Sequence, residues 1–144
     1  PQSLFQRRLF ERHFVGLVRR GHPLADRRPT MRAFAMAPQL VVRMTSGVQE
    51  HIDTVLAARR LARRDVLELP SYLMVPPLLQ ATDFLAVLPG QLADAFMQQG
   101  AFAPVDLPLA LPRSTIRMHW HRRYHDDAGN SWLRELVAAE LTDG

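Results

Sequence analysis

Short apolar segments of strand length alternate with helical patterns along most of this chain. Strand-like segments lie at 4–11, 13–19, 39–44, 65–69, 84–88, 102–107 and 115–120. Helical patterns lie at 31–37, 48–61, 72–79, 91–98 and 130–141. The last of them has an apolar side made of Trp132, Leu133, Leu136, Val137 and Leu141. Because strands that alternate with helices form a mostly parallel sheet with helices on its faces, the sequence predicts an α/β fold.

Two stretches rich in proline interrupt this alternation. The first contains Gly21, Pro23 and Pro29, and the second runs from Pro104 to Pro112. Residues of this kind favour turns and loops, so we expect a crossover connection at each place. The length of 144 residues corresponds to about one domain, and no internal repeat is visible.

The composition argues against several classes of protein. The chain has no cysteine, which excludes disulfides, zinc fingers and catalysis by a thiol, and which is compatible with a reducing, intracellular compartment. No apolar run approaches the ~20 residues that a membrane span needs, and no segment resembles a signal peptide. We therefore expect a cytoplasmic protein without a membrane partner.

The charge of the chain is positive but dispersed. The formal net charge is +4 and the isoelectric point is close to 10.9, which on its own would favour nucleic-acid binding. However, all 18 basic residues are arginines, and they are scattered in pairs such as Arg59–Arg60 and Arg63–Arg64. Because no continuous basic block forms, we expect a solvated surface and no direct contact with DNA by this segment.

The sequence contains no motif of a nucleotide-binding protein or a serine hydrolase. Walker loops, G-x-G-x-x-G and G-x-S-x-G are all absent, so we predict neither an enzyme nor a cofactor. Ser46 and Ser71 each follow a strand and open a helix. The free N–H groups at such a place suit an anion or a carboxylate, and each serine can equally cap its helix without any ligand.

A group of histidines near the end of the chain offers an alternative. His119 and His121 lie two residues apart on a strand and so share a face, and His125, Asp126 and Asp127 follow. Imidazoles with carboxylates can bind zinc or iron. The other interpretation is a surface strand end and a polar turn before the last helix.

Several short motifs occur together in one order along the chain. They are LFERHFVGLVRRGHPLA, LELPSYL, TDFLAVLP followed by QLADAF, LPLALP and MHWHRRYHDDAGNSWLREL. The most specific are HPLA at His22–Ala25 and the ending that runs from Trp120 to Glu135. In order and spacing these motifs resemble the effector-binding domain of LysR-type transcriptional regulators, in the branch that includes nodulation and aromatic-catabolism regulators. The resemblance covers almost the whole chain.

The resemblance implies a two-lobed sensor like the type 2 periplasmic binding proteins. It implies that residues 1–20 and 106–144 belong to lobe one and that residues 21–105 form lobe two. The winged helix-turn-helix for DNA and the first part of lobe one would then lie outside this sequence, which would hold one complete lobe and part of the other. The implied partners are a small-molecule effector, other copies in a homodimer or homotetramer, and DNA only through the absent segment.

Members of this family bind an effector between the lobes, against strand ends and helix starts. Carried over by position, the ligand-binding residues are Ser46, Gly47, Val48, Leu69, Ser71, Tyr72, Phe10 and His13. Phe10 and Tyr72 favour an aromatic or apolar effector, and the two serines suit its carboxylate or hydroxyl. Binding would favour closed lobes over open ones. Two alternatives remain: a solute-binding protein, which shares this fold, and a small metal-dependent enzyme that uses His119 and His121.

Overall fold

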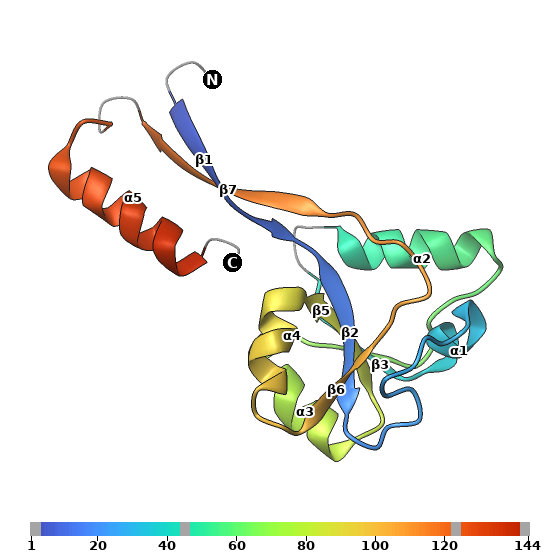
Figure 1. Cartoon of the computed structure of the whole chain (residues 1–144). Coiled ribbons are helices and arrows are strands. Elements are labelled where there is room, and N and C mark those ends of the chain that lie inside the picture. Colours follow the sequence, from blue (N-terminus) through green and yellow to red (C-terminus); the bar gives the residue numbers. More distant parts are fainter. Residues whose placement is uncertain (1–3, 44–46, 122–124, 142–144) are drawn as a thin grey trace. The chain divides into compact units, whose positions relative to one another are not determined.

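The structure consists of two compact units. It is a computed structural model that describes residues 4–43, 47–121 and 125–141 (Figure 1). Unit 1 combines Pro1–Arg12 with Arg113–Gly144, and unit 2 is His13–Pro112. Each unit has a sheet of its own, so the chain leaves unit 1 after one strand and returns to it for its last strand and helix.

Unit 2 contains a five-stranded sheet in the order β4-β3-β5-β2-β6. Its strands are β2 (Phe14–Arg19), β3 (Gln39–Val41), β4 (Val66–Glu68), β5 (Leu85–Pro89) and β6 (Phe102–Val105). β3 is parallel to β4 and to β5, whereas β2 is antiparallel to both of its neighbours, β5 and β6. Within this sheet β2 alone runs against the other strands, which confirms the predicted α/β class with a mostly parallel sheet.

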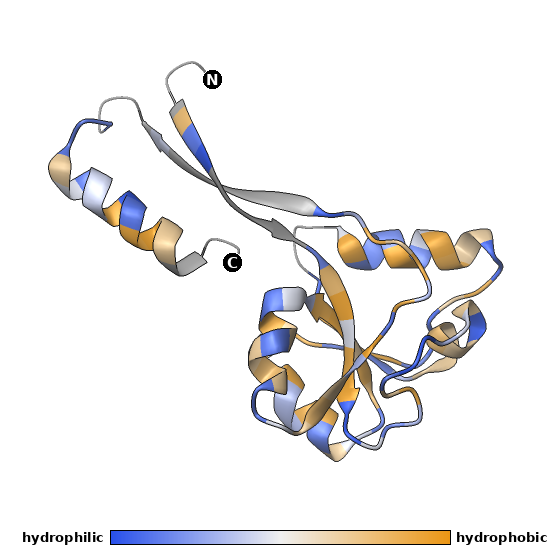
Figure 2. Cartoon of the chain, in the orientation of Figure 1, coloured by the Kyte–Doolittle hydropathy of each residue, from blue (hydrophilic) through white to orange (hydrophobic). Residues whose placement is uncertain are grey.

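Helices cover both faces of this sheet. They are α1 (Met31–Met36), α2 (Val48–Ala58), the 3-10 helix η1 (Tyr72–Met74), α3 (Val75–Ala81) and α4 (Gly90–Met97). In β5, Leu85 and Val87 join a core cluster with residues of α1 and α2, whereas Ala86 and Leu88 join a second cluster with residues of α3 and α4. Because side chains alternate along a strand, one core forms on each face. Figure 2 shows apolar segments in the ribbons of β2 and α2.

The helix predicted at 72–79 is divided into two pieces. Ser71 caps η1, as predicted: its Oγ accepts a hydrogen bond of 3.1 Å from the N–H of Leu73. α3 then begins at Val75, and Pro76 lies in its first turn, where a backbone N–H has no helical partner to lose. The proline pair therefore explains why the apolar pattern does not form one continuous helix.

The start of α2 differs from the prediction. Ser46 was the expected N-cap, but Gly47 holds that position. Gly47 has a φ of 73°, a left-handed conformation that glycine adopts without steric cost. The expectation for Ser46 as the cap is therefore wrong, and the remaining structure around Ser46 lies outside the described residues.

Unit 1 is an antiparallel pair of strands followed by one helix. β1 (Leu4–Arg12) pairs with β7 (Ser114–His121), with Phe5 opposite Trp120, and α5 (Ala128–Leu141) comes after the pair. The register shifts by a bulge or irregularity within β1, after Arg8. The predicted strands and the last predicted helix are thus present.

The apolar side of α5 is largely uncovered. The exposed fraction is 66% for Trp132, 51% for Leu133 and 43% for Leu136, whereas Ala138 is buried. Two strands and one helix offer too little apolar surface to cover the whole stripe. None of the helices in the described ranges is both long and apolar enough to span a bilayer.

The unit boundaries differ from the lobe boundaries that the resemblance implies. Those fall after residues 20 and 105, whereas unit 2 runs from His13 to Pro112. β2 accounts for the earlier start, because it pairs with β5 and β6 in the sheet of unit 2.

Candidate functional site

The ends of three parallel strands lie side by side in unit 2. β4, β3 and β5 are neighbours in that order, and η1, α2 and α4 begin shortly after them. α2 packs on one face of the sheet, whereas α3 and α4 pack on the other, so the connection after β3 diverges from those after its neighbours. Open α/β sheets bind ligands at such a switch point. We call the three helix starts, Gly47–Val48, Ser71–Tyr72 and Pro89–Gly90, the carboxyl edge.

Among the described residues, no side chain caps the backbone N–H groups in the first turn of α2, whose N-cap is Gly47. Gly47 is exposed, and a Cβ atom built on it would meet nothing within 4 Å, so the approach to this helix start is open. The Val48 side chain is 3% exposed and belongs to the core, so Val48 can offer a ligand only its backbone. Because a helix start carries partial positive charge, this arrangement favours an anionic ligand.

The start of η1 offers side-chain groups. The Ser71 hydroxyl already accepts the capping hydrogen bond, but it keeps its own proton, which it can donate. Ser71 and Tyr72 are half-buried, and Tyr72 packs against the core cluster that contains Leu69. Leu69 is 8% exposed, so its side chain belongs to the core. The hydroxyl of Ser71 and the ring of Tyr72 are therefore the groups that this segment presents.

His13 lies against the start of α4. Phe14 is opposite Pro89 in the β2–β5 pair, which brings the beginning of β2 to the carboxyl edge. The carbonyl of His13 accepts a hydrogen bond of 2.8 Å from the N–H of Gly90. A Cβ atom built on Gly90 would overlap the imidazole of His13, so a glycine is needed for the ring to rest there. The Pro-Gly step after an apolar strand was the sequence signal for Gly90.

Arg43, two residues after the end of β3, lies beside the site and was not identified from the sequence pattern. Its guanidinium forms ion pairs with Glu68 at 2.7 Å, Glu50 at 3.2 Å and Asp53 at 3.6 Å. The hydrogen bond to Glu68 is the largest cause of a raised pKa for Arg43. These contacts join the end of β4 to α2 beside the carboxyl edge. The only signal for them was a charged residue at the end of a β-branched strand.

A second arginine, Arg63, contacts α2. The Arg63 side chain is 2% exposed, and it pairs with Asp53 at 2.9 Å. It also donates to the side-chain oxygens of Gln49 at 2.8 Å and Gln39 at 3.1 Å, and to the backbone carbonyl of Gln49 at 3.2 Å. Gln49 lies in the first turn of α2. Arg63 therefore stabilises the position of this helix start, which forms part of the carboxyl edge.

One family model matches almost the entire chain. It is the LysR substrate binding domain, and it matches residues 1–142. The chain belongs to the LysR substrate-binding domain family.

Curated relatives of this LysR domain are transcriptional regulators. The chain is 36% identical over 142 residues to the HTH-type transcriptional activator NahR of Pseudomonas putida, covering 98% of this chain and 47% of NahR. It is 32% identical over 135 residues to the HTH-type transcriptional activator NagR of Ralstonia sp, covering 93% of this chain and 44% of NagR. The chain thus spans about half the length of the curated relatives it matches.

Solved LysR regulatory domains have the same fold. The regulatory domain of MexT, a transcriptional activator in Pseudomonas aeruginosa, aligns with a TM-score of 0.75 at 21% identity, covering 96% of this chain and 68% of that one. The CcmR regulatory domain of Synechocystis PCC6803, in complex with 2-PG, aligns with a TM-score of 0.72 at 15% identity, covering 98% of this chain and 68% of that one. This confirms the predicted periplasmic-binding-protein-like class.

Six of the eight residues predicted to bind the effector of this LysR domain lie in unit 2. They are Gly47, Val48, Leu69, Ser71, Tyr72 and His13. The fold brings all six to the carboxyl edge or directly beside it. Phe10 lies in β1 of unit 1, and its side chain is outside the described part of the structure, as is the whole of Ser46.

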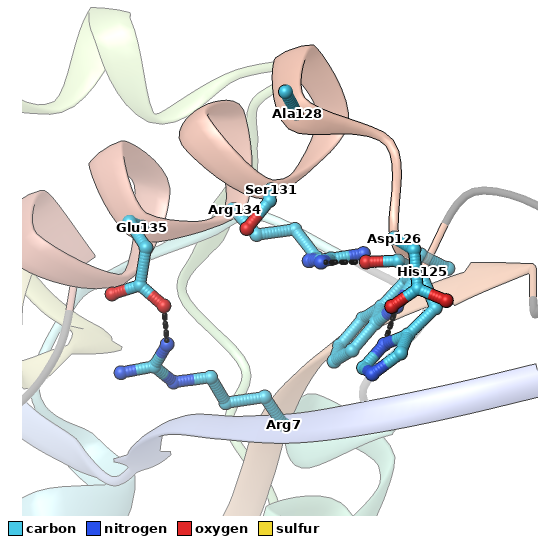
Figure 3. A pocket seen from close by; sticks show the side chains of 8 residues that line it. Arg7, His125, Asp126, Ala128, Ser131, Arg134 and Glu135 are labelled. Carbon is cyan, nitrogen blue, oxygen red and sulfur yellow. Dashed lines mark hydrogen bonds and ion pairs between the residues drawn. The ribbon is translucent and has the colours of Figure 1, made fainter.

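A polar cavity of about 490 Å³ lies within unit 1 (Figure 3). The guanidinium of Arg134 lies 4.3 Å from the centre of the Trp120 ring and donates to the carbonyl of His125 at 2.8 Å. Arg7 and Glu135 also line the cavity and form an ion pair of 2.9 Å with each other (Figure 3). Because these contacts join α5 to the pair β1–β7, the groups that line this cavity hold unit 1 together.

The histidines of the metal-site alternative are only partly described. Nδ1 of His125 accepts a hydrogen bond of 3.2 Å from Nε1 of Trp120, and its ring stacks on Phe5 with 4.3 Å between centres. The side chains of His119 and His121 lie outside the described part. Among the residues that are described, no group of three or more His, Cys, Asp or Glu could hold a metal ion.

Proposed function

We propose that this LysR domain senses a small effector at the carboxyl edge and serves as the regulatory part of a transcriptional regulator. The observation that carries the proposal is the meeting of three helix starts at adjacent strand ends. η1 and α4 have no acidic residue in their first turns, and no side chain in the described part of the chain caps α2. Backbone N–H groups at helix starts favour an anionic group on the effector. The acidic residue in the first turn of α2, Glu50, is paired with Arg43.

The effector in this proposal is a small aromatic or apolar molecule that carries a carboxylate or a hydroxyl. The ring of half-buried Tyr72 supplies an apolar surface, and the Ser71 hydroxyl supplies a donor. The CcmR regulatory domain, which has this fold, was solved with 2-PG bound, which supports a small-molecule role for such domains.

The signal in this proposal is a shift of populations. In this proposal unit 2 (His13–Pro112) serves as lobe two, and unit 1 serves as a part of lobe one. An effector that binds closed lobes more tightly than open lobes increases the closed fraction. A DNA-binding segment outside this sequence, in a cytoplasmic homodimer or homotetramer, would respond to that change. In this role the domain catalyses no reaction and needs no cofactor.

A pair of cap mutants tests the site. Ser71 and Thr30 each accept a hydrogen bond of 3.1 Å from a helix N–H, but Thr30 caps α1 and not a segment of the carboxyl edge. Ser71→Ala and Thr30→Ala therefore each lose about 0.5–2 kcal/mol of stability. Isothermal titration with a panel of substituted benzoates is expected to show weaker binding for Ser71→Ala alone.

Two results would contradict the proposal. Equal affinity in both variants would exclude Ser71 from the site. An absence of binding or of any melting shift across the whole panel, in a protein that contains both complete lobes, would exclude aromatic acids as effectors.

A further inference from the structure

Unit 2 contains a cavity at the amino ends of its parallel strands, opposite the carboxyl edge. It measures about 430 Å³, and α1, the chain after α2 and the chain entering β4 line it. Asp65 directly precedes β4, and α1 leads into β3. The cavity therefore lies beside the amino ends of the strands whose carboxyl ends carry the proposed effector site. Nothing in the proposed function uses it.

Positive charge dominates this cavity. Arg32, Arg60 and Arg64 line it, and Asp65 is the one acidic residue among its described lining. The three arginines are exposed, and no described residue forms a hydrogen bond or ion pair with their guanidinium groups. Arg63, which lies between them in sequence, is in contrast fully engaged with a carboxylate and two glutamines. Three unpaired guanidinium groups around a hollow concentrate anions there.

Arg60 occupies a backbone position that favours glycine. It has a φ of 59° directly after the C-cap of α2, and Leu61 N–H bonds to the carbonyl of Leu56 while Arg60 N–H bonds to that of Ala57. These two hydrogen bonds define a Schellman motif, in which the left-handed residue is usually glycine. An arginine is therefore held in a disfavoured conformation with its side chain on the cavity. Strained residues of this kind cluster at functional sites.

The remaining lining is apolar. Leu61 packs partly against the core, and Met36 is 70% exposed at the rim. Three arginines and one aspartate leave two net positive charges, which matches a ligand with two negative charges. We propose that Arg32, Arg60 and Arg64 bind a small dianion with an apolar body, such as an aromatic dicarboxylate or an aryl phosphate. Guanidinium groups suit both anions because each offers a fork of parallel donors.

This site is separate from the carboxyl edge, but one residue lies between the two. Arg63 is flanked by cavity residues and grips Gln49 at the start of α2. The inference goes beyond the proposed function, and either one can fail without the other.

NMR titration of the full chain tests the site with two probes, isophthalate and phenyl phosphate. Amide shifts are expected to concentrate at 32–36 and 59–65 for at least one probe, with saturation at one equivalent. Isophthalate alone would identify a carboxylate ligand, and phenyl phosphate alone a phosphate ester. Inorganic phosphate is expected to bind more weakly than phenyl phosphate, because it lacks the apolar body.

Three variants separate the site from general charge. Arg60→Gly removes a cavity guanidinium and relieves the backbone, so we expect an unchanged or higher melting temperature with at least about tenfold weaker binding. Asp65→Asn is expected to tighten binding by removing the opposing charge. Arg59→Ala, which removes a neighbouring charge outside the cavity, is the matched control and is expected to leave affinity within about twofold.

Several outcomes would overturn the inference. They are equal losses in Arg59→Ala and Arg60→Gly, which would indicate nonspecific ion attraction, shifts confined to the carboxyl edge, and no saturable shift with either probe. Arg64→Ala provides a second cavity variant if Arg60→Gly fails to fold, and it is expected to show the same loss of affinity.

Discussion

Unit 2 covers both faces of its sheet, whereas unit 1 leaves the apolar side of its helix open. Leu85 and Leu88 in β5 are 0% exposed, but Trp132 in α5 is 66% exposed. Unit 2 is one continuous stretch with helices on both sides, and unit 1 joins a strand pair and one helix from two distant segments. The comparison shows that apolar spacing makes an amphipathic helix, but that a core forms only where enough elements meet to exclude water. Four pairs of substitutions test this difference.

The largest expected difference comes from two leucines. Leu88 is 0% exposed in unit 2, and Leu133 is 51% exposed in unit 1. Leu88→Ala is expected to lose about 2–5 kcal/mol of unfolding free energy, because it leaves a cavity in a packed core. Leu133→Ala is expected to lose less than about 0.5 kcal/mol. Urea denaturation measures both, and equal losses would break the comparison by showing that α5 is covered in solution.

A pair of arginines gives the second difference. The Arg63 side chain is 2% exposed, and that of Arg7, which pairs with Glu135, is 43% exposed. Arg63→Ala removes the donor to the side-chain oxygens of buried Gln39 and Gln49 and the partner of Asp53, so a loss of about 2–4 kcal/mol is expected. Arg7→Ala is expected to cost at most about 1 kcal/mol. Urea denaturation measures both variants. A loss below about 1 kcal/mol for Arg63→Ala would refute the role of Arg63 in stabilising the start of α2.

Two glycines at helix starts are expected to respond with opposite signs. Gly90→Ala brings a methyl group onto the ring of His13, an exposed residue whose ring must then turn away, and this is expected to cost about 0.5–1.5 kcal/mol. Gly129→Ala in α5 meets only Asp127, at 3.6 Å, so the higher helix propensity of alanine is expected to add about 0.5–1 kcal/mol. Adding His13→Ala to Gly90→Ala sharpens the test. Failure of this second change to restore stability would show that the ring is not what excludes the methyl group.

The smallest effect is expected where the two units are alike. Glu68 pairs with Arg43 in unit 2 and Glu135 pairs with Arg7 in unit 1, and both carboxylates are mostly exposed. Glu68→Gln and Glu135→Gln are each expected to cost about 0.2–1 kcal/mol, less at high salt. A salt-independent loss in either variant would contradict this.

The pH dependence of the Arg43 contacts follows from the direction of its pKa. The pKa of Arg43 is raised in the folded protein, so its contribution is complete below the unfolded value and is lost only as the pH rises through the folded value. That range is strongly alkaline, so Arg43 itself adds no pH dependence of stability near neutral pH. Thermal melts of wild type and Arg43→Met check this, since the difference between them is expected to stay constant from pH 6 to 9.

Much of the fold could be predicted because its signals are local. The alternation of strand and helix patterns, the apolar run that forms β5 and the capping of η1 by Ser71 all depend on neighbouring residues. Gly47, Ser71 and His13 were assigned to the site through the family resemblance and stay a prediction as ligand-binding residues. Their position at one edge of the sheet depends on the strand order β4-β3-β5-β2-β6. The predicted N-cap of α2 was wrong by one residue: the prediction was Ser46, and the N-cap is Gly47. The choice between them depends on the backbone turn after β3.

By itself, the sequence determined the order of elements, the α/β class and the absence of thiol chemistry, because periodicity and composition need no partner. Tertiary structure alone decided which apolar residues are buried, since Leu88 and Leu133 have the same side chain and opposite surroundings. It also decided that Arg63 pairs internally while Arg60 and Arg64 line a cavity. The reason is physical: burial and pairing depend on which distant segments of the chain come into contact. The local sequence around Arg60, Arg63 and Arg64 does not indicate which of them meets a partner.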